Sequence, residues 1–188
     1  MSEVSNYTAL LYYTENDSLR WNAPVQTGTQ VVVTYSFTET ENLQDPASYD
    51  SYGATDYWAY DAAQRLLFRD ALDKFEAASG VIFVEVQSPA MINVFGSSGG
   101  WAGGWANIAQ SSATYTAQGD LVNAYQEMGA GQYGYQVNLH ELGHAMGLAH
   151  PHDGDTTLSD FYDTQSNTVM TYNTEYPYTS ELGTLDVQ

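Results

Sequence analysis

The sequence contains no cysteine and only four basic residues, against 23 acidic ones, in a chain of 188 residues. Without cysteine there is neither a disulfide framework nor a thiolate metal site, so any metal ion must be bound by nitrogen and oxygen ligands. The formal net charge of −19 repels phosphate backbones and anionic membrane surfaces. Nucleic acids and membranes are therefore not expected partners. The acidity itself has two explanations that stay open: solubility or a salty habitat, and a preference for basic or calcium-rich partners.

Long apolar runs are also missing. No segment is apolar enough over a sufficient length to span a bilayer. The first residues, MSEVSNYTALLYYTEND, lack the basic region and apolar core of a usual secretory signal peptide. A chain of this length can form one domain with a sizeable core. We expect a single domain over residues 1–188 and a monomer.

Residue patterns predict five strands and two helices. The strands are expected at residues 31–37, 81–86, 91–95, 105–110 and 119–124, and the helices at 60–78 and about 135–146. Residues 38–57 and the part after His150 read as loops. A strand, a helix and a strand in succession favour a right-handed crossover. The predicted fold class is α+β, with a twisted, mostly parallel mixed sheet, two long helices and a loop-rich C-terminal part.

All four histidines lie within thirteen residues, in the segment HELGHAMGLAHPH that begins at His140. Residues four apart on an α-helix project about 40° from each other and lie about 6 Å apart, so His140 and His144 can hold one ion. Ten residues of continuous helix would carry His150 about 15 Å along the axis, away from that ion. The helix must therefore break. Gly147 is where it can do so, because glycine accepts the left-handed conformation that ends helices, and Pro151 then forbids further helix.

Three neutral imidazoles with an open fourth position form a catalytic rather than a structural zinc geometry. Zinc held in this way lowers the pKa of a bound water to about 7, and Glu141, beside the first histidine, can accept that proton. The chemistry implied is hydrolysis of an amide. The alternative is that the histidines are solvated or hydrogen-bonded side chains on an ordinary helix. It requires the five fixed positions of H-E-x-x-H-x-x-G-x-x-H to coincide by chance, at a frequency well under about one in a million.

This eleven-residue motif is the signature of the metzincin clan of zinc endopeptidases, and residues 169–172, VMTY, resemble the Met-turn that accompanies it. The resemblance implies that Met170 forms a hydrophobic floor beneath the metal. The proline after the third histidine and the tyrosine two residues after Met170 are similar to the serralysins, which are bacterial secreted metalloproteases. That similarity implies a further zinc ligand in the phenol oxygen of Tyr172, which swings away to stabilise the oxyanion when substrate binds.

The resemblance extends over nearly all of the chain, on the segments SLRW at 18–21, VTYSF at 33–37, FVEV at 83–86 and Gly119–Asp120. It implies a zincin-like fold, one catalytic zinc ion, protein or peptide substrates and secretion to the extracellular space, and it allows an inhibitor protein as a partner. The G-G-x-G-x-D-x-U-x calcium repeats that usually follow a serralysin catalytic domain do not occur here, so no repeat indicates calcium. The end of the chain, from Leu182, resembles the start of the family's last catalytic-domain helix. We therefore expect either a domain cut short at that helix or a naturally minimal enzyme.

Substrate-binding residues are predicted from the same resemblance, because metzincin proteases bind an extended peptide antiparallel to an edge strand above the zinc. The candidates for that strand are Trp105, Ala106, Asn107 and Ile108; an interior strand or a surface loop are the alternatives. Tyr176 and the nearby Tyr178 are candidates for the wall of the first primed-side pocket, which would then favour large apolar side chains. Aromatic packing alone explains these two tyrosines about as well.

Two alternatives concern the loop after the third ligand and the function as a whole. The residues of that loop are either a second metal or calcium site or a solvated acidic loop: His152, Asp153, Asp155, Asp160 and Asp163.

The alternative function is a zinc-binding interaction module that keeps the metal ligands without proteolysis. The presence of both Glu141 and Tyr172 argues against it, because a binding module needs neither.

Overall fold

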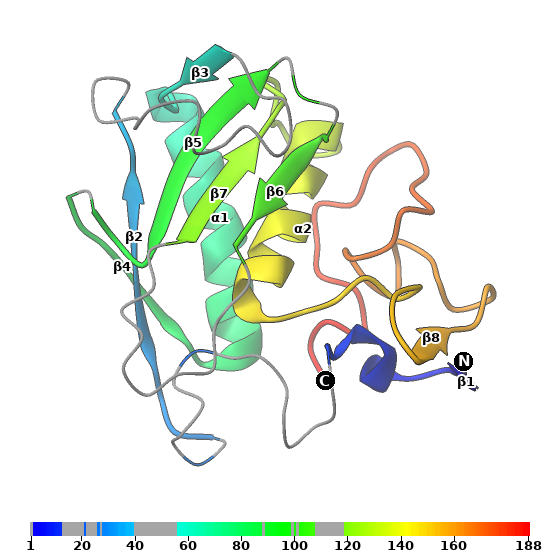
Figure 1. Cartoon of the computed structure of the whole chain (residues 1–188). Coiled ribbons are helices and arrows are strands. Elements are labelled where there is room, and N and C mark those ends of the chain that lie inside the picture. The colour runs from blue at the N-terminus through cyan, green and yellow to red at the C-terminus, as the bar shows by residue number, and fades with distance from the viewer. Residues whose placement is uncertain are drawn as a thin grey trace.

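The computed structural model describes residues 2–12, 21, 26, 28–39, 56–87, 89–98, 100, 102–107 and 119–188. Its main sheet has the strand order β4-β2-β5-β7-β6 (Figure 1). These strands are β2 (Val32–Phe37), β4 (Ile82–Glu85), β5 (Ile92–Ser98), β6 (Gly104–Ala106) and β7 (Gly119–Asn123). All neighbouring pairs are parallel except β6 with β7, which are antiparallel. The predicted mixed, mostly parallel sheet with two long helices is confirmed.

A sixth strand, β3 (Asp56–Trp58), pairs antiparallel with the end of β5. The sequence analysis placed residues 38–57 in a loop, and that prediction is wrong for Asp56 and Tyr57, which belong to this strand. Its three residues are too few for the alternation of apolar and polar side chains to show. The strand predicted at 105–110 begins one residue earlier, as β6, and residues 108–110 lie outside the described part of the chain.

Helix α1 (Ala62–Ser79) begins and ends at the residues that local chemistry favours. Asp61 accepts a hydrogen bond from Gln64 N at 2.8 Å while the Gln64 side chain accepts one from Asp61 N, which is a reciprocal capping box. At the other end Gly80 has φ of 72°, the left-handed conformation in which glycine has no Cβ penalty. The buried face of α1, with Phe68, Leu72 and Phe75, packs into the main core.

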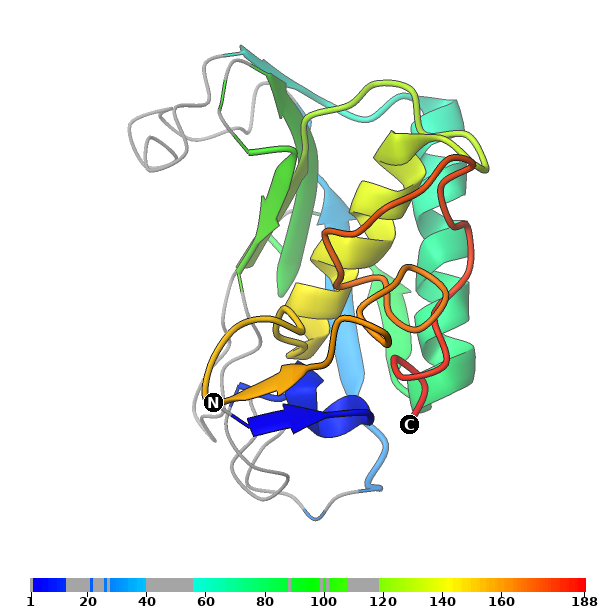
Figure 2. The ribbon, with the colours of Figure 1, turned by 90° about the vertical axis from the view of Figure 1, so that its right-hand side faces the viewer.

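Helix α2 (Tyr133–Met146) lies on the same face of the sheet as α1, as the side view shows (Figure 2). A buried polar network fixes its position. Asn123 Nδ2, at the end of β7, donates to Gly134 O at 2.7 Å and to Asn138 Oδ1 at 2.8 Å. Tyr60 OH donates to the same Asn138 oxygen at 3.0 Å. Because these buried groups satisfy one another, a shift of α2 along β7 would leave several of them unpaired.

The N-terminal residues pack against the segment that follows α2. Strand β1 (Ser2–Val4) pairs in parallel with β8 (Thr156–Leu158), and the short 3-10 helix η1 (Tyr7–Leu10) comes next in the chain. Leu10 O accepts a hydrogen bond from Ala149 N at 2.8 Å, and Leu11 forms an antiparallel bridge with Leu148. The sequence analysis did not predict this contact. Within the described residues, no helix has the length and apolarity needed to cross a membrane.

Candidate metal centre

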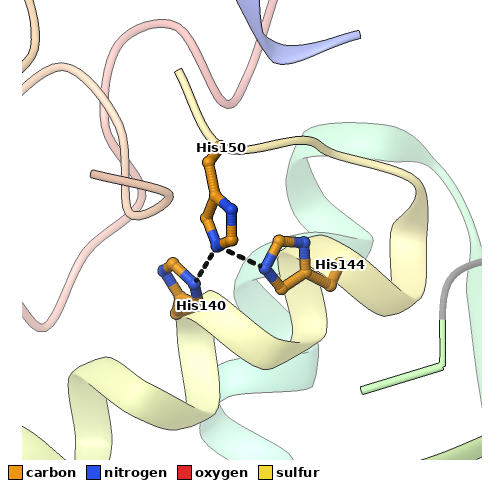
Figure 3. A group of neighbouring side chains, drawn as sticks. All are labelled: His140, His144 and His150. Carbon is orange, nitrogen blue, oxygen red and sulfur yellow. Dashed lines mark hydrogen bonds between the residues drawn. The ribbon is translucent and has the colours of Figure 1, made fainter. Parts of the chain in front are cut away.

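Helix α2 carries the first two histidines and ends where the sequence predicted. Gly147 has φ of 102°, and its N–H donates to His144 O at 2.9 Å. Leu148 N donates to Gly143 O at 2.9 Å, which completes a tight turn at the end of the helix. The chain then reverses, and His150 returns to the face of α2 that carries His140 and His144 (Figure 3). The predicted break of the helix at Gly147 is confirmed.

The three imidazoles meet through their Nε2 atoms. His150 Nε2 lies 3.2 Å from His140 Nε2 and 2.9 Å from His144 Nε2. A tetrahedral zinc site with Zn–N bonds of about 2.0–2.1 Å separates its nitrogen ligands by about 3.3 Å. The arrangement of the three Nε2 atoms is therefore close to what one tetrahedral ion requires.

The partners of the Nδ1 atoms decide which nitrogen carries the proton. His140 Nδ1 donates to Val169 O, His144 Nδ1 to Leu148 O and His150 Nδ1 to Asp153 Oδ2, each at 2.8 Å. Carbonyl and carboxylate oxygens only accept, so each Nδ1 holds its hydrogen and each Nε2 presents a lone pair. Three converging lone pairs cannot hydrogen-bond to one another. The donor set therefore fits a cation.

Burial keeps these imidazoles neutral. It lowers the pKa of His140 to about 3 and that of His144 to about 4, because a charged ring loses its hydration there. The pKa of His150 is also lowered by burial, although the hydrogen bond to Asp153 opposes that shift. Neutral imidazole is the form that binds metal ions.

Glu141 lies beside this cluster and has almost no access to water. Its Oε2 is buried and accepts no hydrogen bond within the described residues, and burial raises the pKa of the carboxyl to about 8. The backbone of β6 approaches it closely, since a Cβ at Gly104 would lie 2.9 Å from Glu141 Oε1. Glu141 and His140 line the same cavity of about 330 Å³, so this carboxyl borders the space next to the metal ligands.

The segment predicted to be a Met-turn packs directly under the helix. Met170 is fully buried, and a Cβ at Gly143 would overlap its Sδ, so the absence of a side chain at Gly143 makes room for the sulfur. Val169 O accepts the hydrogen bond from His140, and Val169 N donates to Asp186 Oδ2 at 2.8 Å. Asp186 also accepts from Thr168 Oγ1 at 2.5 Å. The turn is therefore held on one side by His140 and on the other by the partly buried carboxylate of Asp186.

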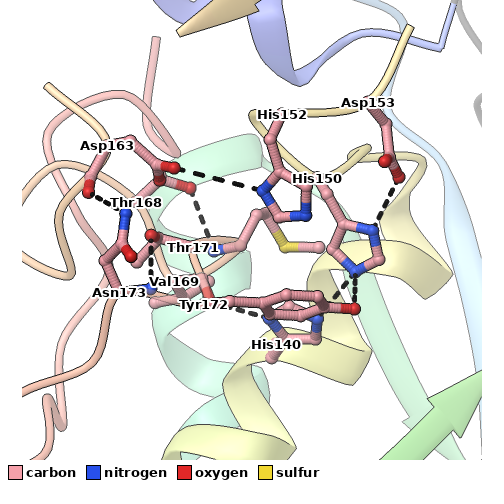
Figure 4. A network of polar contacts seen from close by, with 11 residues as sticks. His140, His150, His152, Asp153, Asp163, Thr168, Val169, Thr171, Tyr172 and Asn173 are labelled. Atoms are coloured by element: carbon pink, nitrogen blue, oxygen red, sulfur yellow. Dashed lines mark hydrogen bonds and ion pairs between the residues drawn. The ribbon is translucent and has the colours of Figure 1, made fainter. Parts of the chain in front are cut away.

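Tyr172 completes the group at the solvent side (Figure 4). Its hydroxyl oxygen lies 2.9 Å from His150 Nε2, and its ring stacks on His140 with centroids 5.7 Å apart. The ring of His152 stacks on that of His150, with centroids 5.3 Å apart and an angle of 6° between the ring planes. His152 Nδ1 lies 4.0 Å from Asp163 Oδ2. With 63% of its surface exposed, Tyr172 has room to turn toward solvent.

The choice between a second metal site and a solvated acidic loop after His150 stays untested. His150, His152 and Asp153 form a second group with metal-binding atoms close together. Asp153, however, is the hydrogen-bond partner of His150 and so belongs to the first cluster. His152 is part of the stack against Tyr172.

The predicted substrate-binding residues fall into four groups. Trp105 and Ala106 lie on β6, which is the last strand in the sheet order and so an edge of the described sheet. Asn107 is hydrogen-bonded to β7, because its Oδ1 accepts a hydrogen bond from Asp120 N at 2.7 Å. Ile108 lies outside the described residues. Tyr176 is 85% exposed and is not among the residues that line the cavity beside Glu141.

Sequence reasoning missed several residues of the site. The cavity is also lined by Tyr133, Gln136, Val137, Thr171 and Thr174. For two of them a signal was present: Gln136 lies four residues before His140, and Val137 four before Glu141, so each occupies the same helix face one turn earlier. Asp186 gave no such signal, because its role depends on contacts between segments 17 residues apart.

The fold and the histidine cluster together define a metzincin-type domain. The model of the Matrixin peptidase family matches residues 26–175, and the chain belongs to this family. The serralysin of Proteus mirabilis is 25% identical over 184 residues, which cover 83% of this chain and 36% of that protein. The chain thus spans little more than a third of this relative's length.

The structure of myroilysin shares the fold, with a TM-score of 0.55, 16% identity, and coverage of 90% of this chain and 92% of that one. Together with the family match and the serralysin relative, it identifies a serralysin-like metzincin catalytic domain.

Proposed function

We propose that this domain is a zinc-dependent endopeptidase that hydrolyses internal peptide bonds of extended protein substrates outside the cell. One observation carries the proposal. Three Nε2 lone pairs converge with Nδ1 atoms fixed by hydrogen bonds, and a buried carboxyl lies beside them. Such a donor set with an adjacent glutamate is the arrangement that zinc peptidases use. Membership of a peptidase family supports the same reaction class.

His140, His144 and His150 would hold the zinc ion. When bound, the ion supplies Lewis-acid polarisation of the scissile carbonyl and lowers the pKa of water at its open position. The Nδ1 hydrogen bonds to Val169, Leu148 and Asp153 orient the three rings for that task.

Glu141 acts as general base and then as general acid. It accepts a proton from the attacking water and passes it to the leaving amine. Its burial gives this exchange a site from which bulk water is excluded. Beside a bound cation the carboxyl would be ionised in spite of its burial, and its unpaired Oε2 can then accept the proton. Gly104 contributes by bringing the β6 backbone against Glu141, because a Cβ there would crowd Val137, Val122 and the Glu141 carboxyl group.

Tyr172 acts as a ligand that disengages and as a donor to the oxyanion. Its hydroxyl lies beside the metal-binding atom of His150, and its exposed ring can turn while Met170 beneath the site stays fixed in the core. A phenol that donates to a developing oxyanion stabilises the transition state more than the ground state.

The substrate backbone binds along the edge strand β6, around Trp105 and Ala106. Main-chain hydrogen bonds to such an edge supply affinity with little choice of sequence. Protein substrates that are locally unfolded therefore suit the site. The whole of residues 1–188 forms the catalytic domain in this proposal.

The test is cleavage of denatured casein by the zinc-loaded chain, beside the chelated protein and Glu141→Ala. We expect cleavage only in the zinc-loaded, unsubstituted protein, with Glu141→Ala still binding one zinc ion. Proteolysis that persists in Glu141→Ala would overturn the assigned mechanism. One tightly bound zinc ion without any cleavage would instead favour a zinc-binding interaction module.

A further inference from the structure

The cavity beside Glu141 has a polar inner wall. It measures about 330 Å³ and extends from Gly103, just before β6, to Thr174 after the Met-turn. On the α2 side it is lined by Tyr133, Gln136 and Val137, together with His140 and Glu141. Tyr133 is held between Tyr125 and Tyr178, with ring centroids 5.0 and 4.9 Å away, so this wall is built from packed residues.

Gln136 is the unusual residue of that wall. Only 3% of it is exposed, its Oε1 is buried without a hydrogen bond, and no hydrogen bond to its Nε2 occurs among the described residues. Gln64, another buried glutamine, shows the normal situation. Its Oε1 accepts from Asp61 N and its Nε2 donates to Gln126 O, both at 2.9 Å. Buried amides without partners are rare in folded proteins, so the Gln136 amide calls for a ligand.

We infer that this cavity takes the side chain of a substrate residue that flanks the scissile bond, and that Gln136 selects an uncharged carboxamide, glutamine or asparagine, in that position. The inference rests on the proposed peptidase function. It differs from the apolar preference predicted from Tyr176 and Tyr178.

The chemistry of the wall points to a carboxamide. The Gln136 amide has no hydrogen-bond partner among the described residues, and a substrate carboxamide, which carries an acceptor and donors on neighbouring atoms, can pair with it without bringing a charge. Glu141 is the one charged group among the lining residues other than the histidine ligand. A cationic side chain would therefore form an ion pair with the general base itself, and an anionic side chain would be repelled by it.

An aliphatic substrate side chain of equal size would fill the volume but leave the amide unpaired. Sites built to hydrogen-bond a substrate group reject analogues that lack the group. Two peptides that differ only at the flanking position, glutamine against methionine, should therefore differ by about 10-fold or more in kcat/KM.

The experiment begins with the zinc-loaded full chain and a mixture of unfolded peptides, whose cleavage sites are identified by mass spectrometry. Matched glutamine and methionine peptides built on a cleaved sequence are then compared. Gln136→Met should bring the ratio of their kcat/KM values to about one or below. The control is Gln87→Met, the same chemical change at an exposed glutamine after β4, which should leave the ratio as it was.

A methionine peptide preferred by the unsubstituted chain, or a ratio unaffected by Gln136→Met, would overturn the inference. The comparison on the unsubstituted chain needs no variant, so misfolding of Gln136→Met does not remove the test. Binding of both peptides to zinc-loaded Glu141→Ala, measured by calorimetry, separates the two proposals. Tighter binding of the glutamine peptide supports selection by Gln136 even where no cleavage occurs, and equal binding refutes it.

Discussion

The three histidines of the candidate metal centre differ in what orients them. Main-chain carbonyls hold His140 and His144, and these cannot be removed by substituting a side chain. His150 is oriented by the Asp153 carboxylate, on a side chain that is 57% exposed. The orientation of His150 is therefore the one that a single substitution can release.

Asp153→Ala should lower zinc affinity by about 10- to 100-fold, because the His150 ring loses the partner that fixes its tautomer and direction. Competition against a chelator of known affinity measures this. Asp155→Ala is the matched control, since Asp155 is an exposed acid two residues along the same loop. Equal affinity in Asp153→Ala and the unsubstituted chain would show that packing alone orients His150.

At the scale of elements, the Met-turn packs against α2 at Gly143, a residue that has no side chain. The space that a Cβ would take at Gly143 is filled by Met170 Sδ. The neighbouring residue on the helix is His144, and the neighbouring residue on the turn, Val169, holds His140. A displacement here would therefore reach both ligands of α2.

Gly143→Ala should push Met170 away and weaken zinc binding, with a loss of stability of roughly 1–3 kcal/mol from overpacking. The double variant Gly143→Ala with Met170→Ala tests the cause. If the clash is responsible, the second substitution costs less in the Gly143→Ala background than in the unsubstituted chain. Thermal unfolding and chelator competition on all four proteins measure both effects. Additive losses would mean that Gly143 acts without Met170.

The elements that the sequence predicted are those with local signals. Helix α1 has its cap at Asp61 and its stop at Gly80, and the end of α2 at Gly147 followed from the need to return His150. The pairing of β1 with β8 had no such signal, because three residues in each strand pair across about 150 positions. Contacts of that kind depend on tertiary packing, which local patterns do not encode.

The same division holds for the site. The three histidines and Glu141 stand in one motif: helical spacing puts His140 and His144 on one face of α2, and the break at Gly147 returns His150 to them. The Asp186 carboxylate under the Met-turn, the unpaired Gln136 amide and the Tyr133 wall became visible only with the fold. The role of each of these residues depends on its neighbours in space, which the sequence pattern does not give.

At the scale of the whole molecule, opposite electrostatic effects compete. The basic residues of the described part, Arg65, Arg69 and Lys74, each face a carboxylate, at 2.6, 2.8 and 3.1 Å. Such partly exposed pairs contribute about 0–1 kcal/mol each and are weakened by salt. Against them stands a net charge of −19, which favours expansion of the chain.

Because the weak ion pairs of these three basic residues cannot balance 19 excess negative charges, added salt should stabilise the folded chain. Raising sodium chloride from about 0.1 to 1 M shortens the Debye length from about 10 to 3 Å, and the Tm of the zinc-loaded protein should rise. Arg69→Gln removes the pair with Glu85 and one positive charge, so its Tm should start lower and rise more steeply with salt. A Tm that falls as salt is added would mean that the ion pairs outweigh the repulsion, because only their loss can make screening destabilising.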